Sequence, residues 1–246
     1  APWTPRGAHR WPHCARVEAG RRHHVRGMQS RMPGASQEAP RAAPGRPPHG
    51  VQPLAAEAAE RMLLALRRAG LPLNRRAPAE APEGLESRGC TLGLTTDRSG
   101  GGAVCSRATR RKPKLVQVLC EACCQACPDF KFTSIQVSLN TKYRMHHDGC
   151  DSGPSRMVTL GNFSRGRMWL HDSPLSSWTA VDPHNRWVAF DGREYHLTED
   201  WDGPERFSLV YFTNPGWCSR SMAPGVKPRL EELGFPWPEP GDIFKA

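Results

Sequence analysis

The chain has 246 residues, of which 24 are proline and 23 are glycine, and its formal net charge is +10. The sequence contains no run of about eighteen apolar residues, which excludes an ordinary membrane-spanning helix. The positive charge belongs to one half only, because residues 1–112 carry +12 and residues 113–246 carry −2. A basic, phosphate-binding surface is therefore expected in the first half and not in the second.

Residues 1–53 are rich in Pro, Arg, Gly and Ala and have no periodic apolar pattern, so we expect them to be disordered. They lack the order of segments that makes a signal peptide, although an Arg-rich, acid-poor start is also typical of a transit peptide. The first residue is not Met, which would suit a fragment. Nine cysteines without a secretion signal favour reduced thiols in an intracellular protein, with nuclear and organellar placement both left open.

Two helices are predicted before the β-rich part of the chain. In residues 54–69 the apolar side chains share one helical face, and Gly70 and Pro72 end the segment, which either docks on the core or binds a partner. Residues 74–112 have the composition of a linker, so 1–112 is expected to be an extension with one short helix. Pro113 suits the first turn of a helix that runs to about Ala126.

Four cysteines of that second helix have two interpretations: Cys120, Cys123, Cys124 and Cys127. They form two overlapping Cys-x-x-Cys pairs, which are typical of zinc sites. They also fall on one helical face, where cysteine behaves as a small apolar residue. The overlapping pairs leave no loop to wrap a tetrahedral ion, so the spacing favours a buried helix face.

Short β-type runs follow Pro128. Alternation predicts strands at 132–140, 142–148, 155–160, 166–170, 186–190, 194–198 and 206–213, which indicates an all-β sandwich or barrel. Asp191-Gly192 predicts a tight hairpin between two of them. A short helix is expected near Lys227–Leu233, within a C-terminal extension over 217–246 that packs on the core domain of residues 113–216.

His146 and Asp148 are candidate metal ligands. Two residues apart on a strand, they leave the same face and can share one ion, whereas His147 points the other way unless a bulge exchanges the two histidines. Two imidazoles and one carboxylate on one face of iron(II) leave the other coordination positions open, and His196 is the candidate third ligand. A solvated loop is the alternative interpretation of His-His-Asp, and a structural histidine is the alternative for His196.

Arg206 and Ser208 lie at i and i+2 of a strongly apolar strand and face the same side. A buried arginine needs an anionic partner. The far carboxylate of 2-oxoglutarate would supply one, because guanidinium binds carboxylate in bidentate fashion and a serine hydroxyl adds a hydrogen bond. The alternative is a structural ion pair with Asp191, Glu194 or Glu199.

The pattern of His-x-Asp, a distant His and Arg-x-Ser on a late strand resembles the iron(II)- and 2-oxoglutarate-dependent dioxygenases. Residues 113–236 look like the TET/JBP-type oxygenase domains of algae and protists, through motifs that include Leu160-Gly-Asn-Phe163, Phe190-Asp-Gly192 and Arg206-Phe-Ser-Leu-Val-Tyr-Phe-Thr213. Gly149-Cys-Asp-Ser152, and the arginines that flank Gly166, depart from that pattern at the substrate mouth. The resemblance implies a double-stranded β-helix, or jelly-roll, core with flanking helices.

The resemblance also implies an oxidoreductase. Iron(II) would be held by His146, Asp148 and His196, and 2-oxoglutarate by Arg206 and Ser208, with dioxygen as the second cosubstrate. Asn140 and Tyr143 are candidate cosubstrate or substrate contacts, or else residues that shape a strand end. The implied reaction hydroxylates a methyl group on a pyrimidine base of DNA or RNA. The alternatives are a prolyl-type protein hydroxylase and a catalytically silent, nucleic-acid-binding member of the same fold.

Overall fold

The computed structural model describes residues 50–74, 79–97, 102–149, 151–171 and 178–243. The predicted disorder of residues 1–49 lies outside these ranges. In the described part of the chain, no helix is both long enough and apolar enough to cross a membrane.

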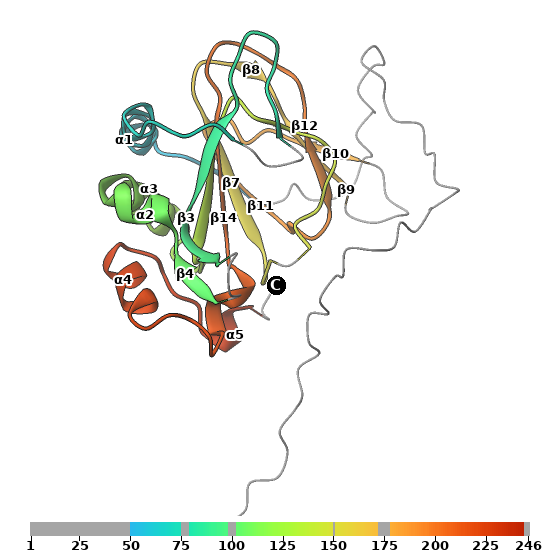
Figure 1. The fold of residues 1–246 in the computed structure, drawn as a ribbon. Helices are drawn as coiled ribbons and strands as arrows, with labels where there is room; N and C mark the ends of the chain where they lie inside the picture. The colour runs from blue at the N-terminus through green and yellow to red at the C-terminus, as the bar shows by residue number, and fades with distance from the viewer. Residues whose placement is uncertain (1–49, 75–78, 98–101, 150, 172–177, 244–246) are drawn as a thin grey trace, which may run out of the picture. The chain divides into compact units, whose positions relative to one another are not determined.

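A large antiparallel sheet of seven strands dominates the structure. Its order is β1-β11-β7-β14-β5-β3-β4 (Figure 1). The strands are β1 (Val51–Pro53), β3 (Arg88–Thr96), β4 (Ala103–Cys105), β5 (Ser134–Leu139), β7 (Ser155–Leu160), β11 (Arg186–Phe190) and β14 (Phe207–Phe212).

A smaller sheet of three strands has the order β10-β9-β12. From β7 onward the chain passes to this sheet, returns at β11, crosses again to β12 and returns at β14. This alternation between two antiparallel sheets is the double-stranded β-helix that the family resemblance implies. The strands are β9 (Met168–His171), β10 (Thr179–Val181) and β12 (Tyr195–Thr198), and two short pairs join β13 (Trp201–Asp202) to β8 (Ser164–Arg165) and β2 (Ala79–Glu80) to β6 (Lys142–Tyr143).

Helices lie on one side of the large sheet (Figure 1). Pro113 occupies the first turn of its helix, as expected, and the side chain of Ser106 caps the preceding helix by accepting a hydrogen bond from Thr109 N at 3.1 Å. The predicted helices near 54–69, 113–126 and 227–233 are all confirmed. The helices are α1 (Ala56–Arg67), α2 (Arg107–Arg111), α3 (Pro113–Ala126), α4 (Val226–Glu232), α5 (Pro240–Ile243) and the 3-10 helix η1 (Pro215–Cys218).

The main core lies between this helical layer and the large sheet. Alternation along β5 sends Ile135 and Val137 toward the helices, and Leu119 of α3 is fully buried against that side. Helix α1 joins the same core through Met62 and Leu66, so docking on the core is its role. A second, smaller core fills the space between the two sheets and contains Met157, Met168, Leu170, Val181, Val188 and Phe190.

The cysteines of α3 belong to the main core. Cys120, Cys123 and Cys127 are buried and Cys124 is half-buried, and all four are free. Within the described ranges, the only group of three or more side chains placed to share a metal ion lies elsewhere. The prediction of an apolar helix face is confirmed.

Two predictions about the first half of the chain are wrong. Residues 74–112 are not simply a linker, because β3, β4 and α2 fall in this range and β3 pairs with β5 over six positions. Ordered structure also starts well before Pro113, since residues 51–53 form β1 and pair with β11. The composition of residues 74–112 suggested a linker, but the segment contains strands that pair with partners far away in sequence.

The predicted hairpin at Asp191-Gly192 is also wrong. A turn does occur there, with Glu194 N donating to Asp191 O at 3.1 Å. The strands on either side do not pair with each other, however, because β11 belongs to the large sheet and β12 pairs with β9. The turn is therefore a corner at which the chain changes sheet.

Replacing Gly93 with alanine is expected to destabilise the protein by about 3 kcal/mol or more. Gly93 has a φ of 89°, and an added Cβ would lie 2.2 Å from Thr133 O and 2.8 Å from the ring of Phe235. Gly241→Ala is the control, because nothing lies within 4 Å of the added Cβ. Chemical denaturation of both variants checks the expectation, and equal free energies of unfolding would show that β3 does not pack as described.

Candidate metal centre and its pocket

His146 and His196 face each other across two antiparallel segments. Their backbones exchange two hydrogen bonds, His146 N to His196 O at 3.0 Å and His196 N to His146 O at 2.9 Å. Side chains at directly opposed positions emerge on the same face of a pair. The two imidazole rings accordingly lie with their centroids 4.3 Å apart.

Each ring is oriented by a backbone carbonyl two residues upstream. Nδ1 of His146 lies 2.8 Å from Arg144 O, and Nδ1 of His196 lies 2.9 Å from Glu194 O. A carbonyl only accepts hydrogen bonds, so Nδ1 is the donor in each ring, which leaves Nε2 as the atom available to a metal ion. Histidine ligands of metal ions are typically oriented in this way.

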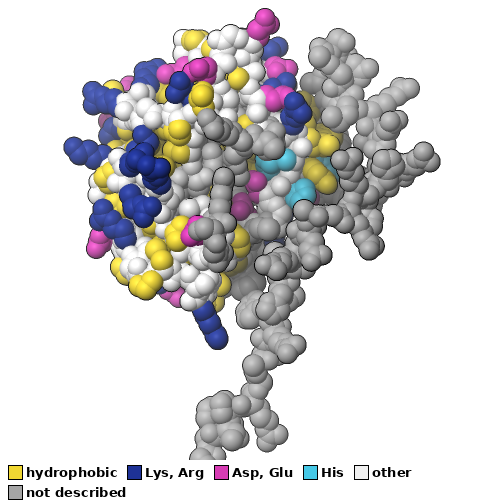
Figure 2. Space-filling view, in the orientation of Figure 1, with side chains coloured by type: hydrophobic (Ala, Val, Ile, Leu, Met, Phe, Trp, Pro, Cys, Tyr) yellow, Lys and Arg dark blue, Asp and Glu magenta, His cyan; other side chains and the backbone are white. Residues whose placement is uncertain are grey.

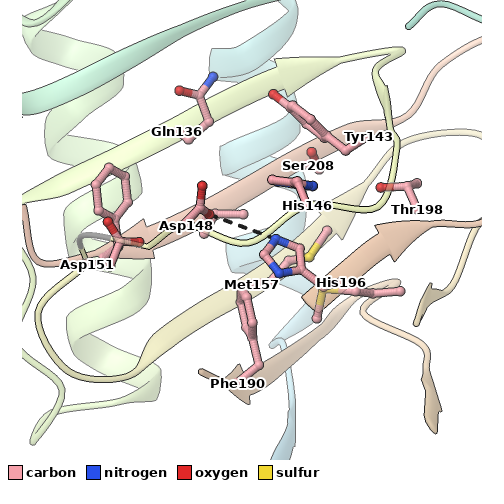
Figure 3. A pocket seen from close by; sticks show the side chains of 13 residues that line it. Gln136, Tyr143, His146, Asp148, Asp151, Met157, Phe190, His196, Thr198 and Ser208 are labelled. Atoms are coloured by element: carbon pink, nitrogen blue, oxygen red, sulfur yellow. Dashed lines mark ion pairs between the residues drawn. The ribbon is translucent and has the colours of Figure 1, made fainter. Parts of the chain in front are cut away.

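Asp148 completes a group of three candidate ligands. One donor atom from each of His146, Asp148 and His196 lies within 4.8 Å of the others, and Asp148 Oδ2 is 3.8 Å from His196 Nε2 (Figure 3). The backbone of Asp148 is held by a 2.7 Å hydrogen bond from its N–H to Gly192 O. The structure therefore brings together the three residues that the sequence predicts, while His147 turns away and packs its ring against Tyr195.

Burial lowers the pKa of His196, and the neighbouring His146 lowers it further. The hydrogen bond to Glu194 O and the charge of Asp148 raise the pKa, but by less, so the net shift is downward. His196 is thus neutral near pH 7, which is the form that binds a metal ion.

The three residues line a pocket between the two sheets. Its empty volume is about 620 Å³, part of which is open to solvent. Tyr143, Thr198 and Ser208 lie on one side of the triad and Asp151 lies on the other (Figure 3). Gln136 also lines the pocket and donates to Ser138 Oγ, which contacts the hydroxyl of Tyr143. Apolar side chains complete the wall: Met157, Met168, Phe190, Val210 and Phe212. We call the side with the three hydroxyl groups the hydroxyl end of the pocket.

Arg206 is buried next to the hydroxyl end. It precedes β14 and shares the face of Ser208, it is 1% exposed, and its guanidinium carbon lies 5.1 Å from the ring centroid of Trp201 and 5.4 Å from that of Phe163. Its Nη2 donates to Gly166 O at 2.9 Å. Within the described part of the chain, nothing accepts a hydrogen bond from its Nε.

Among the described residues, no carboxylate lies within ion-pair distance of Arg206, although the charge of Asp182 acts on it from farther away. Asp191 pairs instead with Arg193 at 2.5 Å, and Glu199 pairs with Arg167 at 2.9 Å. Burial lowers the pKa of Arg206 to about 10, so it stays charged at neutral pH. The alternative of a structural ion pair is wrong for Asp191 and Glu199, and the guanidinium keeps a positive charge with no carboxylate in direct contact in the described chain.

Asn140 and Tyr143 have different roles. The side chain of Asn140 accepts from Arg206 N at 2.8 Å and donates to Pro204 O at 3.0 Å, and Asn140 does not line the pocket. It therefore shapes the strand end, which the sequence had left open as an alternative. Tyr143 lines the pocket, and its hydroxyl lies 2.9 Å from Ser138 Oγ.

Arginines near the pocket mouth have acidic partners. Arg144 pairs with Glu80, and Arg165 pairs with Asp202. The visible Lys and Arg side chains gather mainly on the helix-bearing side of the molecule, away from the histidines (Figure 2). The described part of the chain therefore presents no strip of unpaired positive charge beside the site.

Several lining residues escaped the sequence analysis, although strand alternation could have found some of them. Gln136 of β5 lies opposite Val210 of β14, and Val210 and Phe212 follow Ser208 along β14 at two-residue intervals. Thr198 follows His196 by two residues on β12. Asp151 and Phe190 reach the pocket through loop geometry and sheet crossing, for which the sequence carries no local signal.

No protein-family model matches the sequence, and no curated protein matches it either. Solved structures do resemble its fold. An oxidoreductase of the 2OG-Fe(II) oxygenase family from Burkholderia pseudomallei is 16% identical over 65% of this chain and 80% of that chain, with a TM-score of 0.46. A Trichoplax adhaerens prolyl hydroxylase, in complex with a hypoxia inducible factor peptide, is 14% identical over 69% and 86%, with a TM-score of 0.42. NgTET1 in complex with 5mC DNA is 14% identical over 74% and 79%, with a TM-score of 0.47.

Proposed function

We propose that this protein is an iron(II)- and 2-oxoglutarate-dependent oxygenase. The observation that carries the proposal is the pairing of two features at one pocket: the His146, Asp148 and His196 triad, and the buried Arg206 beside its hydroxyl end, which has no ion pair in direct contact among the described residues. Either feature alone has several explanations. Together they match a metal ion and an anionic cosubstrate that bind side by side.

The donor set of the triad fits iron(II). Two neutral nitrogens and one carboxylate oxygen on one side of the ion are the ligands of non-haem iron oxygenases, and they leave open positions for other ligands. Ligands bound at about 2.1 Å in adjacent positions would lie about 3 Å apart. The Nε2 to Oδ2 distance of 3.8 Å between His196 and Asp148 needs only a small closure to reach that spacing.

The hydroxyl end fits the far carboxylate of 2-oxoglutarate. Arg206 brings a positive charge with an unused N–H group, and Ser208 and Thr198 bring hydroxyl groups that line the pocket. A buried charge without a partner is costly, so a carboxylate at this position would remove an existing penalty. The triad would then hold the keto-acid end nearest the metal ion.

When bound, iron(II) would couple the conversion of 2-oxoglutarate and dioxygen into succinate and carbon dioxide to the insertion of one oxygen atom into a substrate C–H bond. The chain's own residues position these partners. The carbonyls of Arg144 and Glu194 hold the two imidazoles, and Met157, Met168 and Phe190 keep water from the pocket wall. Exclusion of water strengthens the electrostatic contacts within the site.

Succinate should form when the full chain is incubated with iron(II), ascorbate and 2-oxoglutarate, and its formation should stop when a chelator removes the metal. Oxygenases of this kind slowly convert 2-oxoglutarate even without their substrate, so the test does not require the substrate to be known. Succinate formation that does not depend on iron would contradict the proposal. So would a chain that binds 2-oxoglutarate but forms no succinate at any iron concentration.

For the substrate, we propose a methyl group on a pyrimidine base in nucleic acid. Tyr195 is 47% exposed and Met145 is 44% exposed beside the triad, and an exposed ring next to a pocket can stack a base that has been flipped out of a helix. The test compares succinate release stimulated by methylated DNA or RNA oligonucleotides with that stimulated by unmethylated ones. Equal stimulation, or none, would reject this substrate.

One observation favours a second candidate, a prolyl-type protein hydroxylase. Arg144, Arg165 and Arg167 all have acidic partners near the mouth, so phosphate groups would have to displace them. A neutral peptide could bind without displacing these acidic partners. Proline-containing peptides, assayed beside the oligonucleotides, separate the two candidates, and mass spectrometry should show a gain of one oxygen atom on the true substrate.

A further inference from the structure

Three buried donor groups near the hydroxyl end lack an acceptor in the described ranges: Arg206 Nε, Thr159 Oγ1 and Trp201 Nε1. Buried polar groups in native proteins are nearly always hydrogen-bonded. Under the proposed function, only the first of these three groups binds the far carboxylate, together with Ser208 and Thr198. The other two remain to be explained.

Thr159 lies directly opposite Ser208. The two residues are in register between β7 and β14, and side chains at such positions have Cβ atoms about 4.5–5.5 Å apart. Ser208 lines the pocket, whereas Thr159 is fully buried behind it at 0% exposure. Its hydroxyl therefore faces the pocket side of the large sheet without a hydrogen-bond partner of its own in the described chain.

Trp201 reaches Arg206 from β13. Its ring packs against the guanidinium of Arg206, with 5.1 Å between the guanidinium carbon and the ring centroid. Gly166 separates the two at the backbone: an added Cβ would lie 3.0 Å from Arg206 Nε and 3.0 Å from Trp201 Cβ. A side chain at Gly166 would therefore crowd both groups, and its φ of 72° also favours glycine.

We infer that Thr159 and Trp201 bind the same carboxylate as Arg206 and Ser208, through the hydroxyl of Thr159 and the indole N–H of Trp201. The inference rests on the proposed function, since it takes that carboxylate to be the far one of 2-oxoglutarate. A carboxylate offers about four lone-pair sites. A guanidinium, two hydroxyl groups and an indole N–H supply the donors to fill them.

The experiment measures 2-oxoglutarate binding by calorimetry, using the full chain loaded with manganese(II) so that no turnover occurs. Thr159→Val removes the hydroxyl at nearly constant volume, and Trp201→Phe removes the N–H group. Each is expected to raise Kd for 2-oxoglutarate about 5-fold to 30-fold, as loss of a hydrogen bond to a charged group does. Thr159→Ser should restore binding to within about threefold of the unmodified chain.

The matched control is Trp187→Phe. The indole N–H of Trp187 also lacks a partner among the described residues, but this ring lies in the main core, 5.2 Å from the ring of Tyr211. The Trp187→Phe substitution should leave Kd for 2-oxoglutarate unchanged. A ligand control uses 2-oxobutanoate, which keeps the keto-acid end and lacks the far carboxylate, and no variant should bind it more weakly than the unmodified chain does.

The outcomes separate the inference from the proposal beneath it. Thr159→Val and Trp201→Phe proteins that bind 2-oxoglutarate like the unmodified chain would overturn the inference alone. An equal loss of affinity for 2-oxobutanoate would also overturn it, because the effect would not involve the far carboxylate. An unmodified chain that binds no 2-oxoglutarate would overturn the proposed function itself.

Discussion

His146→Ala is expected to lower iron(II) affinity more than about 100-fold and to abolish succinate formation. Loss of a residue that merely orients a ligand already costs about 10-fold to 100-fold in metal affinity, and this variant removes one of three ligands outright. Calorimetric titration with iron(II) or manganese(II) gives the affinity, and succinate release gives the activity. The fold should survive, because the two backbone hydrogen bonds to His196 do not involve the side chain.

The neighbouring histidine provides the control. His147→Ala changes the same residue type at the next position, but its ring packs edge-on against Tyr195 and lies outside the triad. Metal affinity should stay within about threefold of the unmodified chain, well short of what loss of even an orienting contact costs. If His147→Ala weakens metal binding and His146→Ala does not, the assignment of the two histidines is reversed.

Arg206→Met is expected to separate stability from cosubstrate binding. Removal of a buried charge that lacks a counter-ion relieves a penalty, while the cation–π contacts with Phe163 and Trp201 are lost. The free energy of unfolding without ligand should therefore stay within about 1 kcal/mol of that of the unmodified chain, or rise. Affinity for 2-oxoglutarate should fall at least about 30-fold, because the carboxylate loses its charged partner.

Thermal unfolding with and without 2-oxoglutarate measures both effects. At a concentration 1,000 times Kd, the ligand should stabilise the unmodified chain by about 4 kcal/mol, and the Arg206→Met protein should lose most of this gain. Arg167→Met is the matched control, since Arg167 already has Glu199 as its ion-pair partner. Unfolding of Arg206→Met without ligand would show instead that Arg206 serves the fold.

The metal triad could be predicted from the sequence because its signals are local. His146 and Asp148 are two residues apart, and the strand that carries His196 has its own alternation. Arg206 and Ser208 likewise share one strand face. Burial of the arginine follows from the apolar strand around it, and the structure confirms that burial at 1% exposure.

Contacts between distant segments could not be predicted in the same way. Gly93 suggested a linker, yet it lets β3 pack closely against Thr133 and Phe235. Asp191-Gly192 indicated a turn correctly, but no local pattern shows that the strands beside it belong to different sheets. Trp201 reaches Arg206 only through the packing of β13 and β8.

The backbone pairing of His146 with His196 links the metal centre to strand register. A slip of one position between the two segments would place Met145 or His147 opposite His196 and turn the correct ligand to the other face. A shared metal ion would stabilise only the correct alignment, because the slipped one offers fewer ligands on that side. In a chain that crosses repeatedly between two sheets, the metal ion would thus favour the correct strand register during folding, in addition to its role in the reaction.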